Sequence, residues 1–108
     1  MDELNFKIWL TSKGINKKVS RDVVSRLKRI EREIKNCDID EEYRKDKCNH
    51  LISIFLNNGK NEEMKKYLYT NFPVGKYHIS TFRYALNKYV QFCDELYNNS
   101  SSNCFKSE

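Results

Sequence analysis

Turn-forming residues are scarce in this chain of 108 residues, which has one proline and three glycines. A β-sandwich or a β-barrel needs frequent tight turns, and those turns depend on these two residue types. Their scarcity therefore argues for helices. The length is that of a single domain with a modest hydrophobic core.

Long apolar runs are also lacking. No stretch approaches the roughly 20 apolar residues that a membrane-spanning helix needs. The first residues, MDELNFKIWL, begin with acidic side chains and contain no apolar segment of the kind found in signal peptides. We therefore expect no membrane partner, a cytoplasmic location and thiols that stay reduced.

Motifs of catalysis and metal binding are missing as well. The sequence contains no G-x-S-x-G, Walker A, H-E-x-x-H or G-x-G-x-x-G pattern. Its four cysteines form no C-x-x-C pair, and neither histidine has a ligand-like spacing from them. We expect Cys48 and Cys93 to be small core residues, His50 to be structural and His78 to cap a helix. No metal, no cofactor and no enzymatic activity are expected.

Helical periodicity predicts an all-α, compact bundle of four to five helices. The expected helices cover residues 2–14, 16–35, 40–57, 62–69 and 79–97. Gly14 is expected to end the first helix and Asn16 to cap the second. Residues 1–97 would form the domain, and the polar segment 98–108 is expected to be a disordered tail.

Two apolar stripes mark the helix faces that should be buried. They recur at intervals of three and four residues, which is the helical period. The second helix carries Val19, Val23, Leu27, Ile30 and Ile34, and the last helix carries Phe82, Leu86, Tyr89, Cys93 and Leu96.

Positive charge is the most informative feature that the sequence does have. The formal net charge is +5, and residues 16–35 contain eight Lys or Arg residues against three acidic ones. Five of these cations fall in one band away from the apolar stripe, namely Lys17, Arg21, Lys28, Arg32 and Lys35, with Lys18 and Arg29 beside it. A mixed-sign face would be typical of a solvated helix, whereas a coherent basic band indicates phosphate binding. Lys17 and Lys18 also flank a helix N-terminus, whose free N–H groups attract anions.

Several motifs resemble the N-terminal core-binding domain of tyrosine recombinases and phage integrases, a SAM-like bundle of four or five helices. That family has an F-x-x-[WY]-L helix, a G-[LI]-[ST]-x-x-T helix start and an R-x-A-L-x-x-[FY] pattern in its last helix. The matching residues are Phe6, Trp9, Leu10, Gly14, Ile15, Asn16, Leu27, Ile30, Arg83, Ala85, Leu86 and Tyr89. Val19 stands where the family has threonine.

The resemblance implies a module that clamps one face of double-stranded DNA, while a separate domain carries out recombination. The catalytic residues of that other domain are not matched here, so this chain is not expected to cut or join DNA. The second and the last helix would approach the duplex. The residues expected to contact DNA are Lys17, Lys18, Arg21, Lys28, Arg32, Lys76, Ser80, Thr81, Arg83 and Lys88.

A second hypothesis is that this is a small phage or mobile-element protein that binds a protein partner, as a regulator or inhibitor of a nucleic-acid enzyme. Such a protein would expose an apolar patch, for which four tyrosines are candidates: Tyr67, Tyr69, Tyr77 and Tyr84. A dimer through that patch is a further alternative, and the sequence leaves the oligomeric state open.

Overall fold

The computed structural model describes the backbone of residues 1–107 and the side chains of residues 1–98, and all regular structure within them is helical. The elements are α1 (Glu3–Ser12), α2 (Lys17–Glu33), α3 (Ile39–Asp46), α4 (Asn49–Ile54), the 3₁₀ turns η1 (Leu56–Gly59) and η2 (Met64–Tyr67), and α5 (Ile79–Ser107). This confirms the predicted all-α bundle of four to five helices.

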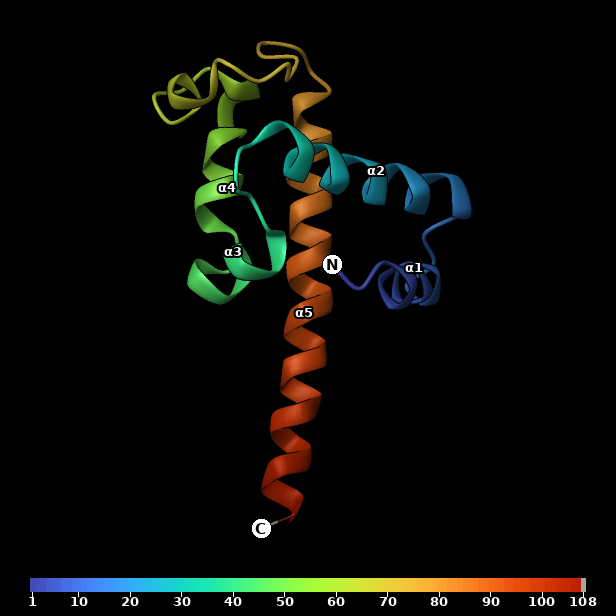
Figure 1. Cartoon of the computed structure of the whole chain (residues 1–108). Coiled ribbons are helices and arrows are strands. Elements are labelled where there is room, and N and C mark those ends of the chain that lie inside the picture. Colours follow the sequence, from blue (N-terminus) through green and yellow to red (C-terminus); the bar gives the residue numbers. More distant parts are fainter. Residues whose placement is uncertain (108) are drawn as a thin grey trace.

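The long helix α5 is the spine on which the other helices pack (Figure 1). α2 crosses it close to its first turns, and the N-terminal end of α2 projects beyond the crossing. α1 lies on one side of α5, below that projecting end, while α3 and α4 lie on the other side (Figure 1). One flank of α2 therefore faces α1, and much of its remaining surface is open to solvent.

The turn between α1 and α2 forms as the sequence predicts. Gly14 takes a φ of +85°, a left-handed conformation that glycine adopts without a steric penalty. Asn16 then caps α2, because its side-chain oxygen accepts a hydrogen bond from the Val19 amide at 2.9 Å. These two residues place Lys17 and Lys18 in the first turn of α2.

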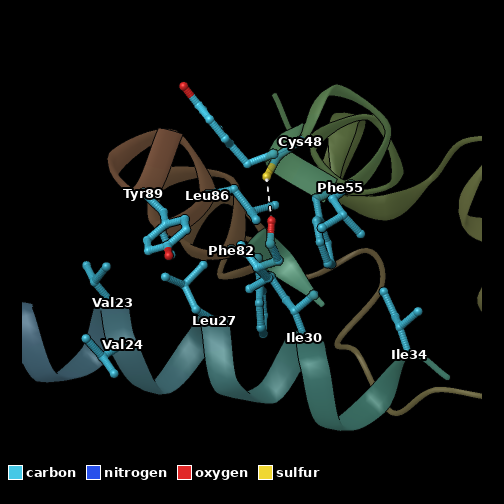
Figure 2. Close-up of a cluster of buried hydrophobic side chains, with 14 of the residues drawn as sticks. Val23, Val24, Leu27, Ile30, Ile34, Cys48, Phe55, Phe82, Leu86 and Tyr89 are labelled. Atoms are coloured by element: carbon cyan, nitrogen blue, oxygen red, sulfur yellow. Dashed lines mark hydrogen bonds between the residues drawn. The ribbon is translucent and has the colours of Figure 1, made fainter. Parts of the chain in front are cut away.

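The core lies between α2, α4 and α5, with α1 closing one end. Figure 2 shows Val23, Leu27 and Ile30 extending from α2 toward aromatic side chains of α4 and α5. All three are buried, as is most of the predicted stripe on α5. Phe55, which ends α4, stacks on Phe82 of α5 with ring centroids 5.2 Å apart.

Two residues of the predicted stripes are not buried. Val19 is 36 % exposed because it lies on the first turn of α2, which projects past α5. Leu96 is 50 % exposed because α5 there extends beyond most of the helices packed on it (Figure 1). Ser20 and Val24 are buried on α2 although the stripe did not include them.

The prediction of one helix over 40–57 is wrong. Lys47 and Cys48 both adopt left-handed conformations, with φ of +56° and +63°, and they separate α3 from α4. In one continuous helix Ile39 and Cys48 would point to roughly opposite sides, yet both are buried. The break brings them together, and the Cys48 thiol donates to the Ile39 carbonyl at 3.8 Å (Figure 2).

The segment 62–69 is also shorter than predicted, with a single 3₁₀ turn at η2. Asn61 holds this turn against the end of α4. Its side chain accepts from the Met64 amide at 2.9 Å and donates to the Ile54 carbonyl at 3.1 Å. Met64 is buried, whereas Leu68 is 69 % exposed.

The last helix begins at Ile79 as predicted, and its backbone stays helical to Ser107 rather than ending near Tyr97. The predicted disorder of 98–108 concerns residues whose side chains, from 99 onward, lie outside those described. That expectation, and the domain boundary at residue 97, stay predictions.

Cys48 and Cys93 are buried, which confirms the prediction of core cysteines. His50 is half-buried, and its Nε2 lies 2.8 Å from the Tyr67 hydroxyl, which supports a structural role. No group of three or more potential metal ligands occurs among the described residues. Along the helices of the described part, no segment combines the length and apolar character that crossing a bilayer requires.

Candidate nucleic-acid interface

The predicted basic band lies on the solvent-exposed flank of α2 that adjoins α1. Lys17, Arg21, Lys28 and Arg32 are all exposed there, and Lys18 is exposed beside them. We call this set of five residues the basic flank. Lys35, which follows α2, instead holds its ammonium 5.5 Å from the centre of the Tyr69 ring.

The acidic residues at the end of α2 do not neutralise the basic flank. Glu31 accepts a hydrogen bond from the Ile39 amide at 3.0 Å, and Glu33 accepts one from the Asn71 amide at 2.6 Å. Both carboxylates therefore hydrogen-bond backbone amides of other segments and hold those segments against α2. Both residues are half-buried.

Four cations of the basic flank are left without an acidic partner. Among the side chains of residues 1–98, none of Lys17, Lys18, Arg21 and Arg32 forms an ion pair. Unpaired like charges on one helix turn repel each other and raise the local positive potential. This arrangement can hold anionic groups at several points along α2.

Lys28 differs from the other four because it has a partner on α1. Its ammonium lies 2.9 Å from the Glu3 carboxylate, which also lies 3.3 Å from Lys7. Hydrogen bonds from Lys28 and then Lys7 lower the pKa of Glu3 from its ordinary value. The sequence did not indicate this pair, because nothing in it shows which part of α1 packs beside Lys28.

A groove runs between α1 and α2 next to the basic flank. Its volume is about 610 Å³, and Lys7, Ile8, Thr11, Ser12, Lys17, Ser20 and Arg21 line it. Two residues of the basic flank, Lys17 and Arg21, thus form part of its wall. The rest of the lining comes mainly from one face of α1.

The residues predicted on α5 and before it have mixed environments. Lys76 and Ser80 are exposed, and the Ser80 hydroxyl donates to the Tyr77 carbonyl at 2.9 Å. Thr81 is half-buried. Its hydroxyl donates to the His78 carbonyl at 2.6 Å and accepts from Arg26 at 3.0 Å. Lys88 is half-buried with its ammonium 5.5 Å from the Tyr84 ring.

Arg83 faces the interior of the bundle. Its side chain is half-buried, and its guanidinium donates to the Phe55 carbonyl at 3.2 Å. That carbonyl belongs to the end of α4, where backbone acceptors lack helical partners. Arg83 therefore ties α4 to α5, a role that the sequence pattern did not suggest.

The predicted contact residues thus divide between two flanks of α2. Lys17 and Arg21 adjoin α1, whereas Thr81 lines a small depression with Arg26 on the opposite flank. The groove beside α1 and this depression share no lining residue.

Two arginines of α2 that lie outside the basic flank pack against aromatic rings. The guanidinium carbons of Arg26 and Arg29 lie 5.6 and 5.5 Å from the centre of the Phe82 ring. Arg29 also donates to the Asn71 carbonyl at 2.7 Å. The sequence could have indicated this packing role, because Arg26 and Arg29 stand next to Leu27 and Ile30. Long cationic side chains often cover the edge of a core.

No family model, no curated protein and no solved structure matches this chain.

Proposed function

We propose that this protein is a DNA-binding module that contacts the phosphates of a duplex through the basic flank of α2. The observation that carries the proposal is the set of four exposed cations without an acidic partner, Lys17, Lys18, Arg21 and Arg32. Contacts of this type position a protein on DNA and carry no sequence information. We further propose that the module acts in the cytoplasm and has no catalytic role in cutting or joining DNA.

The resemblance to the core-binding domain of tyrosine recombinases supports the same proposal. That resemblance places the second helix against DNA, and α2 carries four exposed cations without an acidic partner. We propose a smaller contribution of α5 to DNA contact than the resemblance implies, because Arg83 and Thr81 are hydrogen-bonded within the bundle. Lys76 and Ser80 are the predicted residues near the start of α5 that stay exposed.

The test is a fluorescence-anisotropy titration of a labelled duplex of about 30 base pairs, or three helical turns, at several salt concentrations. Four neutralised phosphates predict a log–log slope of about −3.6 for the association constant against salt. The variant Lys17→Glu/Arg21→Glu should lose at least about 30-fold in affinity, because it removes two phosphate contacts and adds two repulsive charges.

The matched control is Lys65→Glu/Lys66→Glu on η2. Both lysines are highly exposed, and they pair only with Glu62 and Glu63 on their own turn. Each double variant lowers the net charge of +5 by four units, so the two make the same change in net charge at different places. Equal losses in both variants, or no binding at low salt, would contradict the proposal.

A further inference from the structure

We propose that the groove between α1 and α2 binds an acidic amphipathic segment of a partner protein. Apolar side chains of the segment would cover Ile8, and its carboxylates would meet Lys17 and Arg21. The inference shares Lys17 and Arg21 with the proposed DNA contacts, but it adds Ile8, which a phosphate contact does not use, so Ile8→Glu tests it separately from DNA binding.

The floor is an apolar surface that α1 leaves uncovered. Ile8 is 58 % exposed and Leu4, one helical turn earlier, is 71 % exposed. A single exposed apolar residue is ordinary on a protein surface. Here two of them share one helix face, and Ile8 lies in a concave site of about 610 Å³, a volume typical of binding pockets.

The rim of the groove carries cations from both helices. Lys7 comes from α1, and Lys17 and Arg21 come from α2. Lys7 is already paired, since its ammonium lies 3.3 Å from the Glu3 carboxylate. Lys17 and Arg21 form no ion pair among the described side chains, and they are the rim cations that can meet a carboxylate of the segment.

The charge of the rim decides between the candidate occupants. A second copy of this chain, docked through the same groove, would place cations against cations and is therefore disfavoured. A DNA backbone would satisfy the cations but has no apolar side chain to cover Ile8. An amphipathic peptide with carboxylates beside its apolar residues satisfies both, as in helix-in-groove recognition.

The experiment is a display selection of random peptides of about 16 residues, a length that spans about 24 Å as a helix, against the full chain. The selected peptides should be rich in Asp and Glu, with apolar residues three or four positions apart. Their affinity should fall about tenfold or more for Ile8→Glu and for Lys17→Glu. It should change by less than about twofold for the control Leu68→Glu, which alters a leucine elsewhere that is 69 % exposed.

Circular dichroism of each variant shows that the fold is intact. The proposal is overturned if no peptide is enriched, if the selected peptides are not acidic, or if Ile8→Glu leaves their binding unchanged. Light scattering supplies an independent check. A concentration-dependent dimer that Ile8→Glu abolishes would assign the groove to a second copy and also overturn the proposal.

Discussion

At the scale of single residues, the cations of α2 serve two purposes. Lys17, Lys18 and Arg21 extend into solvent without acidic partners, whereas Arg26 and Arg29 cover the Phe82 ring and hold neighbouring segments. The abundance of positive charge on one helix is therefore partly a packing requirement. Only the cations of α2 that face outward are available to bind anions.

The sequence could not separate these roles for every residue. Helical periodicity identified the exposed band correctly, because the position of a side chain around a helix follows from its number. It could not show that Lys28 meets Glu3 or that Arg83 meets the Phe55 carbonyl. Those partners come from distant parts of the chain, and the local pattern has no information about them.

Arg83→Ala tests the packing role of an arginine that the family resemblance assigns to DNA. We expect a loss of about 1–2 kcal/mol in the free energy of unfolding, because the Phe55 carbonyl would lose a charged donor. Urea denaturation measures this loss, and Lys76→Ala, at an exposed position, is the matched control with little expected change. The assignment is wrong if Arg83→Ala keeps full stability but loses DNA affinity.

At the scale of helices, the sequence predicted those helix ends that a glycine or a capping residue marks. It did not predict the helix ends that lack such a residue. Gly14 and Asn16 fixed the turn between α1 and α2 from the sequence, because each favours one backbone conformation. No glycine or proline marks the break between α3 and α4 in the sequence. Lys47 and Cys48 take left-handed conformations there, and the turn lets Ile39 and Cys48 both be buried.

Lys47→Gly tests whether this break stores backbone strain. A non-glycine residue at a φ of +56° lowers the free energy of unfolding by about 1–2 kcal/mol. Glycine removes this steric penalty, but its greater flexibility in the unfolded chain offsets part of the gain. The ion pair of Lys47 with Asp94 is exposed and contributes little. We therefore expect Lys47→Gly to raise the free energy of unfolding by about 0.5 kcal/mol.

The control for this substitution is Lys45→Gly, inside α3. There glycine should lower the free energy of unfolding by about 1 kcal/mol, since the position is helical and exposed. Urea denaturation of both variants gives the comparison. Equal destabilisation by the two substitutions would mean that position 47 is not strained.

At the scale of the whole molecule, the basic flank and a cluster of acidic residues lie on different helices. The basic flank occupies one side of α2, whereas Asp40, Glu41 and Glu42 form the first turn of α3, whose last turn carries Arg44 and Lys45. α3 packs on the other side of α5 from α1 (Figure 1). The exposed cations of the basic flank therefore attract a negatively charged partner to their own side of the molecule.

The most direct test of the central claim is to map the DNA-binding surface by NMR, using backbone amide shifts of the full chain titrated with the same duplex at low salt. The account predicts that the largest shifts fall on Lys17, Lys18, Arg21 and Arg32 and their neighbours on α2, while α3 stays unchanged. It also predicts that added salt reverses these shifts, since phosphate contacts weaken as counterions compete. Largest shifts on α3 or the end of α5, or no shift at all, would contradict the claim that α2 holds DNA phosphates.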